Sequence, residues 1–112
     1  MTDRIGTLRE RVCIEREVRT ADAGGGTLVN WTPLGHAPTV WARIEPLSGH
    51  ELVQAMRLQA RLTHKVTMRW RGDVTAAMRL VWGTRALNIR AVTNPDERRR
   101  YLELYCEEGA AT

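Results

Sequence analysis

The sequence predicts a mainly β domain, either a small antiparallel barrel or a sandwich, with one short α-helix and a long glycine-rich loop. Six or seven short segments alternate apolar and polar residues, which is the pattern of half-buried strands. Turn residues separate these segments, and only one stretch has helical spacing. The chain has 112 residues with no internal repeat and no linker, so residues 1–112 are assigned to a single domain with one modest core.

The first two predicted strands lie on either side of the glycine-rich segment. Residues Arg11–Glu17 alternate, and Leu28–Thr32 form a second strand that Pro33 closes. The segment Thr20–Thr27 between them holds three successive glycines, which lose much backbone entropy when they are ordered. We therefore expect a mobile loop here, centred on Asp22, Gly24, Gly25 and Gly26.

A third strand and a helix follow each other directly. Residues Val40–Glu45 alternate, and pairing should stop at Pro46, since proline has no N–H to donate to a ladder. Ser48 then stands three residues before Glu51, the spacing of a capping box at a helix start. The apolar residues that follow recur on one helical stripe, which predicts a helix over Gly49–Arg57.

The fourth segment alternates most regularly and has two chemically distinct sides. The side predicted to face the core carries Leu62, His64, Val66, Met68 and Trp70. The opposite side carries a largely basic row, formed by Arg61, Thr63, Lys65, Thr67, Arg69 and Arg71.

Three further strands complete the prediction, over Met78–Trp82, Leu87–Ala91 and Tyr101–Glu107. Gly83 and Thr84 have the composition of a tight hairpin turn between the first two of them. The segment Asn94–Glu97 places a proline at the first central position of a turn, flanked by side chains that bond their own backbone.

No group of residues predicts catalysis, a metal site or a cofactor. Ser48, His50 and Glu51 are neighbours at a helix start, where side chains point in different directions, so a nucleophilic relay is not expected. The three histidines lack the spacing of metal ligands. Cys13 and Cys106 lack a CxxC pattern, and both are expected to be free; the second shares strand parity with buried leucines.

The net charge of +4 comes from 17 basic and 13 acidic residues, and sixteen of the basic residues are arginine. One explanation is a GC-rich genome, and the other is a surface that meets phosphate or carboxylate groups. The basic residues of the fourth strand, Arg61, Lys65, Arg69 and Arg71, and those of the last turn, Arg98–Arg100, are read in two ways. They form either a solvated surface or a face toward a nucleic-acid backbone or an acidic subunit.

The tryptophans are assigned by strand parity. Trp70 and Trp82 share parity with apolar residues and are expected in the core, whereas Trp41 lies on the polar side of its strand. An outward tryptophan on a small domain is typical of an interface anchor, and Trp31 is a second candidate.

The sequence shows neither a membrane-spanning helix nor a signal peptide. No apolar run approaches the roughly 18 residues of a spanning helix, and Met1–Gly6 lack the apolar region of a signal peptide. We therefore expect a protein that is made and kept in a cytoplasm.

An ordered series of short motifs resembles the head–tail joining proteins of tailed phages, prophages and gene transfer agents, also called head-closure, stopper or head–tail adaptor proteins. The resemblance runs from Ile5 to Glu108, and each motif alone is weak. The motifs are Ile5-Gly6-x-Leu8-Arg9-x-Arg11-Val12-x-Ile14, Asp22 with its glycines and Trp31, Val40-Trp41-Ala42-x-Ile44-Glu45-Pro46-Leu47-Ser48-Gly49-x-Glu51, Thr63-His64-x-Val66, Asn94-Pro95-Asp96-Glu97-Arg98, and Leu102-x-Leu104-x-Cys106-Glu107-Glu108.

The resemblance implies a non-enzymatic β-barrel that assembles in the host cytoplasm as a homo-oligomeric ring, usually a hexamer, and then joins the virion or gene-transfer-agent particle. Such a ring closes the channel for double-stranded DNA, below the portal and its adaptor ring, and receives the tail terminator or tail tube. The interface residues expected here are Trp31, Trp41, Arg43, Glu45, Ser48 and Glu51. The alternatives are a neighbouring adaptor or tail-terminator ring subunit, and a small nucleic-acid-binding barrel, which would need outward aromatic side chains for base stacking.

Overall fold

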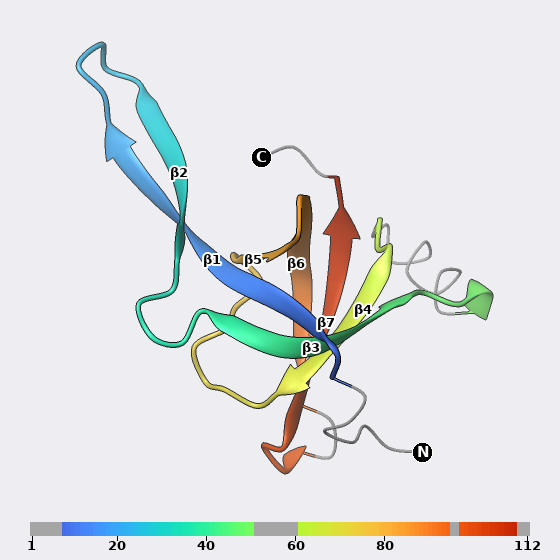
Figure 1. Cartoon of the computed structure of the whole chain (residues 1–112). Helices are drawn as coiled ribbons and strands as arrows, with labels where there is room; N and C mark the ends of the chain where they lie inside the picture. Colours follow the sequence, from blue (N-terminus) through green and yellow to red (C-terminus); the bar gives the residue numbers. More distant parts are fainter. Residues whose placement is uncertain (1–7, 51–60, 95–96, 110–112) are drawn as a thin grey trace.

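A computed structural model of the chain describes residues 8–50, 61–94 and 97–109 as seven antiparallel strands (Figure 1). All seven predicted strands are present, most of them one to four residues longer than expected. The strands are β1 (Glu10–Ala21), β2 (Thr27–Pro33), β3 (Thr39–Pro46), β4 (His64–Arg69), β5 (Arg79–Trp82), β6 (Arg85–Thr93) and β7 (Tyr101–Glu108).

Six of the strands close into a barrel, and this settles the choice between barrel and sandwich. The order along the sheet is β2-β1-β3-β4-β7-β6-β5, and β5 pairs with β1 to complete the circle. The closing register sets Ile14 opposite Leu80. Closure is possible because β1 is 12 residues long: its start pairs with β3, its middle with β5 and its end with β2. The fold is therefore a six-stranded barrel with one extra strand.

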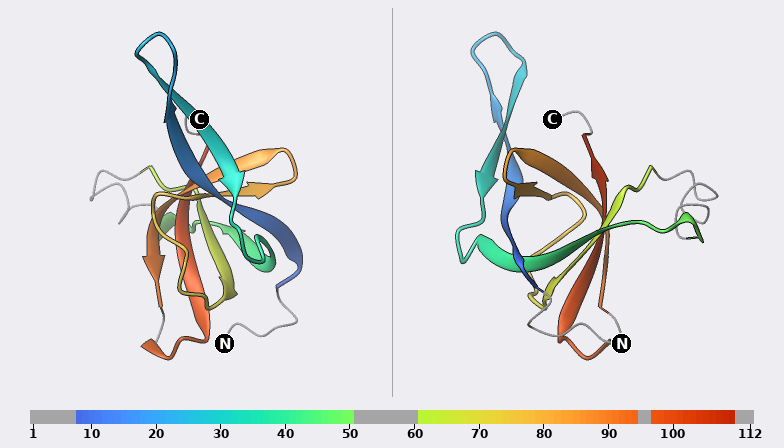
Figure 2. Two further views of the ribbon diagram at one scale, coloured as in Figure 1. Left: turned by 90° about the vertical axis from the view of Figure 1, so that its left-hand side faces the viewer. Right: turned by 45° about the vertical axis from the view of Figure 1, so that its right-hand side comes forward.

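The extra strand makes a hairpin with the end of β1 that projects away from the barrel (Figure 2). The sequence predicted a long loop over Thr20–Thr27, and this length is wrong, because β1 continues to Ala21 and the turn spans only residues 22–26. The side chain of Asp22 explains the short turn. Its Oδ1 accepts hydrogen bonds from the backbone N–H groups of Gly24 and Gly26, each at 2.8 Å.

The core fills the barrel with aliphatic side chains that alternate along each strand. Because the chain has no phenylalanine, the filling comes from leucine, isoleucine, valine and methionine. The residues that are almost completely buried are Val12, Ile14, Ala42, Val66, Met68, Leu80, Leu87, Ile89, Leu102, Leu104 and Cys106. The strand parity predicted from the sequence is therefore confirmed for β1, β3 and β7, for most of β4, and for β6 as far as Ile89. Beyond Ile89 a bulge shifts the register of β6, so Ala91, predicted on the core side, is exposed and Val92 packs against the core.

Two residues near β4 depart from the predicted parity. Trp70, expected in the core, is 37% exposed, because β4 ends at Arg69 and the indole lies beyond the strand, at the open end of the barrel. Thr67, expected on the exposed side, is completely buried and lies between Arg43 of β3 and Glu103 of β7 in the register. Long side chains of this kind cover a small neighbour on an outer face. Trp82 was also expected in the core; it packs against the core residues but is only half-buried.

The predicted turns are confirmed where the structure describes them. Gly83 has a φ of +64°, which a two-residue hairpin turn of this kind requires, and Thr84 completes the turn. The N–H of Glu97 donates to the carbonyl of Asn94 at 3.0 Å, whereas Pro95 and Asp96, the central residues of that predicted turn, lie outside the described residues. Apart from Gly49 and His50, the predicted helix over Gly49–Arg57 lies outside the described residues. In the described ranges there is no helix long and apolar enough to cross a membrane.

Candidate interaction site

A groove of about 1080 Å³ opens beside the end of the barrel where β1 begins, β3 begins and β4 ends. Three segments that are distant in the sequence form it. The lining residues are Leu8 and Arg9 before β1, His36, Ala37, Val40 and Trp41 around the start of β3, and Arg69, Trp70, Arg71, Gly72 and Asp73 at and after the end of β4.

Arg71 holds the walls of this groove together. Its Nη1 donates to the carbonyl of Ala37 at 2.6 Å, and its Nη2 donates to the carbonyl of His36 at 2.7 Å. The same guanidinium binds both carboxylate oxygens of Asp73, at 2.6 and 2.8 Å. This bidentate pair raises the pKa of Arg71 and lowers the pKa of Asp73. The β2–β3 loop and the β4–β5 loop are thus fixed to each other through one side chain.

Two partly exposed indole rings give the groove its apolar character. The side chain of Trp41 is 53% exposed and that of Trp70 is 37% exposed. A guanidinium covers one face of each ring: Arg11 lies 4.9 Å from the centroid of Trp41, and Arg99 lies 5.4 Å from that of Trp70. Arg99 has a φ of +56°, a left-handed conformation that is uncommon outside glycine. The groove is therefore aromatic on its surface and basic around its rim.

The hairpin carries a second exposed apolar surface. Strand β2 contains no charged residue, and its Leu28 and Val29 are 52% and 44% exposed. At the base of the hairpin the indole of Trp31 is half-buried under the guanidinium of Arg79, 4.6 Å from the ring centroid. Arg79 in turn donates through Nε to Glu15 at 2.8 Å. The base of the hairpin is thus attached to β5 of the barrel.

The structure separates the interface residues that the sequence suggested. Trp41, Arg43 and Glu45 alternate along β3, and a carboxylate oxygen of Glu45 lies 3.4 Å from Arg43 and 3.9 Å from Lys65. Trp31 lies on the hairpin, on a different element. Ser48 is exposed beyond the end of β3, and Glu51 lies outside the described residues.

The predicted basic row does not form one continuous strand face. Strand β4 spans only His64–Arg69, so Arg61 and Arg71 lie outside it. Lys65 lies near Glu45, and Arg71 pairs with Asp73, so acidic neighbours neutralise two of the four charges. Arg61 is exposed, and Arg69 is exposed on the rim of the groove. In the last turn, Arg98–Arg100 are all exposed.

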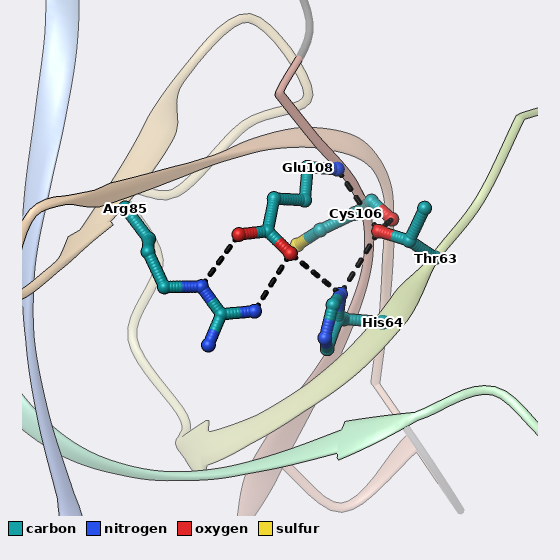
Figure 3. Close-up of polar contacts among 5 residues, drawn as sticks. All are labelled: Thr63, His64, Arg85, Cys106 and Glu108. Carbon is teal, nitrogen blue, oxygen red and sulfur yellow. Dashed lines mark hydrogen bonds and ion pairs between the residues drawn. The ribbon is translucent and has the colours of Figure 1, made fainter.

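A polar cluster joins the start of β4 and the end of β7 to the start of β6 (Figure 3). Arg85 pairs with both carboxylate oxygens of Glu108, with Nη2 at 2.7 Å from Oε1, and this pair lowers the pKa of Glu108. Nδ1 of His64 lies 2.9 Å from the hydroxyl of Thr63 and 3.9 Å from Glu108. A hydroxyl–imidazole–carboxylate relay needs its two partners on different ring nitrogens, whereas both partners here approach Nδ1. The cluster is therefore a structural connection between strands.

Two further features bear on chemistry. Burial raises the pKa of the Cys106 thiol to about 12, so this cysteine is not a nucleophile at neutral pH. The other cysteine, Cys13, is also free and is only half-buried. Among the described residues, no group of three or more histidine, cysteine or carboxylate side chains is placed to hold a metal ion.

Sequence reasoning missed Trp70, Leu28 and Val29 as surface residues. The adjacent apolar pair in β2 was a usable signal, because successive strand residues face opposite sides and a strand with one buried face cannot bury both. No local signal marks Trp70, since its exposure depends on where β4 ends relative to the barrel opening.

Comparison with known proteins agrees with the fold and with the absence of a catalytic group. The sequence pattern of the family described as "Phage head completion protein" matches residues 3–109. A chain in the solution structure of protein SF1141 from Shigella flexneri 2a is 34% identical, with a TM-score of 0.75, over 96% of this chain and 98% of that one. A chain from the virion of a native gene transfer agent particle is 26% identical, with a TM-score of 0.57, over 93% of this chain and 97% of that one. A search of curated proteins gave no match.

These likenesses extend over nearly the whole barrel and its hairpin, and the family match covers almost every residue. The protein therefore belongs to the phage head completion protein family, whose members are non-enzymatic structural proteins of the virion at the head–tail region.

Proposed function

We propose that this protein is a subunit of a ring at the head–tail junction, which closes the DNA exit channel after packaging and receives the tail. The observation that carries the proposal is the combination of family membership with two separate interaction surfaces on one small barrel. Each subunit of a closed ring contacts one neighbour on either side through two different surfaces, and the hairpin and the groove could supply them.

The ring is expected to be a homo-oligomer, most simply a hexamer, with the portal or its adaptor ring on the head side. The tail terminator or tail tube would lie on the tail side. The structurally similar chain from a gene transfer agent virion supports a place in such a particle, reached after assembly in the host cytoplasm. Neither a cofactor nor a membrane has a part in this role.

Electrostatics support a channel that tolerates double-stranded DNA without binding it tightly. The net charge of +4 is modest, and acidic neighbours already neutralise Lys65 and Arg71. Arg61 and Arg69 remain as exposed cations that could face the channel or an acidic patch of an adjacent ring. A wall of this kind avoids repulsion of the phosphate backbone, and DNA can still leave through it.

Deletion of the gene in its own phage or gene transfer agent tests the proposal. Cryo-electron microscopy of the resulting particles should show heads that lose their DNA and carry no tails, and expression of the wild-type protein should restore both. Particles with full heads and normally attached tails would contradict the proposal.

Cryo-electron microscopy of the deletion particles and of labelled wild-type particles separates the alternatives. A tail-terminator subunit predicts full, stable heads beside tails of irregular length. An adaptor subunit predicts density directly against the portal in labelled wild-type particles, one ring above the position of a stopper.

A nucleic-acid-binding barrel is favoured by one observation, the two exposed tryptophans among arginines at the groove. However, a guanidinium already covers one face of each ring. The DNA-binding measurement described in the Discussion decides between this reading and the structural one.

A further inference from the structure

The large apolar side chains that are exposed in the described part of the chain fall into two pairs. Leu28 and Val29 lie next to each other on β2, and Trp41 and Trp70 line the groove. The other large apolar residues of the described ranges are buried or half-buried. Clustered exposed apolar groups on a small domain mark surfaces that another molecule covers.

The two pairs have opposite shapes. Leu28 and Val29 lie on β2, in the hairpin that projects from the barrel (Figure 2). Trp41 and Trp70, in contrast, line a groove. One surface can therefore enter the other. Successive strand residues also point to opposite faces, so the edge of β2 offers one apolar side chain on each side of the ribbon.

A hairpin cannot reach the groove of its own chain. The groove lies at the start of β1, where Leu8 and Arg9 line it, and the hairpin turn begins at the other end of that strand, after Ala21. A strand of 12 residues is roughly 35 to 40 Å long at about 3.3 Å per residue. The two surfaces can meet only between two copies of the protein.

We propose that β2 of one copy docks in the Trp41–Trp70 groove of the next copy, and that repetition of this contact builds the ring. This inference rests on the proposed ring function and names the contact that would form it. Because the two surfaces differ, the contact is heterologous, and an open row of copies keeps one free surface at each end until the circle closes. A two-fold dimer, in contrast, would occupy both surfaces at once or leave the groove empty.

Charge favours β2 as the occupant. The rim of the groove is basic and β2 itself has no charged residue, while Arg19, which lies opposite Val29 on the hairpin, is paired with Glu17 at 2.7 Å. Strand β2 pairs only with β1, so its outer edge presents backbone carbonyl groups to which guanidinium groups can donate. Within the described ranges, Arg69 and Arg99 have no carboxylate partner in their own chain, and the hairpin carries carboxylates at Glu17, which pairs with Arg19, and at Asp22, whose Oδ1 accepts two N–H groups of the turn.

Two sets of substitutions test the contact, one on each surface. The hairpin variant is L28D/V29D, and the groove variant is W41A/W70A. The control is T84D, in the exposed turn between β5 and β6. Circular dichroism and thermal unfolding first establish that each variant is folded, and sedimentation velocity then measures assembly over a range of concentrations.

We expect the wild type and T84D to assemble alike, and each double variant to associate about 100-fold more weakly or worse, as removal of interface anchors does. The decisive sample is an equimolar mixture of the two double variants. Each then keeps one intact surface, so the mixture should form a 1:1 dimer and stop there, whereas either variant alone stays monomeric.

Three outcomes would overturn the inference: assembly of either folded double variant at wild-type concentrations, no dimer in the mixture, or a wild type that is monomeric at about 1 mM. If only the groove variant failed to assemble, the occupant would be a segment other than β2. Rings that persist in both variants would leave the ring function intact and refute this contact alone. Normal tails on particles without the gene would refute the ring function, whatever the mixture does.

Discussion

The guanidinium of Arg79 lies over the indole ring of Trp31, 4.6 Å from its centroid, and this contact joins the projecting hairpin to the barrel. Trp31 belongs to β2, the strand outside the barrel, and Arg79 begins β5, the strand that closes it. Glu15 of β1 accepts a hydrogen bond from the same guanidinium at 2.8 Å. The direction in which the hairpin points is therefore set where three strands meet.

Replacement of Arg79 by alanine should destabilise the protein by about 1 to 2 kcal/mol, because Glu15 loses a largely buried partner and Trp31 loses the cation over its ring. Urea unfolding measures the change. The matched control is R90A, which removes a more exposed pair with Glu107 and should cost about 0 to 1 kcal/mol. Equal effects of the two substitutions would show that the Trp31 contact adds nothing.

Asp73 makes the stability of the groove depend on pH in the acid range. Its pKa in the folded state is lowered from the ordinary value of 3.8, mainly by the hydrogen bonds from Arg71. A lowered pKa means that the stabilisation is complete above the unfolded value and is lost as the pH falls through the folded one. Wild type should therefore exceed D73N by a constant free energy of unfolding above about pH 5, and the difference should shrink below about pH 4.

Urea unfolding between pH 2.5 and 7 gives this difference. Glu108, whose pKa is lowered from 4.5 by Arg85, provides a comparison through E108Q at the other end of the barrel. A difference between wild type and D73N that did not change with pH would refute the assignment.

The two cysteines should react at different rates with a thiol reagent. Burial raises the pKa of Cys106 to about 12, so its thiolate is scarce at pH 8, whereas Cys13 is only half-buried. One thiol per chain should react in the native protein and two in denaturant, and C13S should leave none in the native protein. Because the raised pKa favours the protonated thiol in the fold, this contribution to stability is present below about pH 9 and declines as the pH rises toward 12.

The tip of the hairpin should be among the fastest-exchanging segments of the free subunit and should become protected on assembly. The sequence predicted a mobile loop from Thr20 to Thr27, and the structure leaves only residues 22–26 of it outside the strands. Few apolar contacts restrain such a tip, although Asp22 accepts two of its N–H groups. Hydrogen exchange with mass spectrometry, with β7 as the protected reference, tests this. Strong protection of the tip in the free subunit would argue against a docking role.

Duplex DNA should bind the free subunit weakly, with no sequence preference and with a steep loss of affinity as salt rises. Exposed arginines such as Arg61, Arg69 and Arg98–Arg100 can contact phosphate groups but have no arrangement that reads bases, and the counterions released at these contacts make the affinity fall steeply with salt. Fluorescence anisotropy with two unrelated duplexes, titrated at about 50 to 200 mM salt, measures the affinity and its dependence on salt. Tight, salt-resistant and selective binding would favour the nucleic-acid-binding barrel over a ring subunit.

The sequence determined the strands and their turns, because both depend on local chemistry. Alternation along Arg11–Glu17 and Leu62–Met68 identified which residues face the core, and Gly83 predicted its hairpin through the backbone freedom that a tight turn requires. The lack of a catalytic site could also be predicted, because the serine, histidine, cysteine and carboxylate residues do not recur at the spacings that such sites require.

Only the tertiary structure decided how the barrel closes and which residues its surfaces expose. The pairing of β1 with β5 joins residues that are more than sixty positions apart, such as Ile14 and Leu80, and no local pattern encodes that distance. The same holds for the groove, which three distant segments line, and for Arg71, which the alternation placed in a basic row but which binds Asp73 and two carbonyl groups of another loop. Exposure of Trp70 follows from where β4 stops at the barrel opening. Local alternation fixes which side of a strand a residue faces, whereas neighbours brought together by folding fix whether that side is covered.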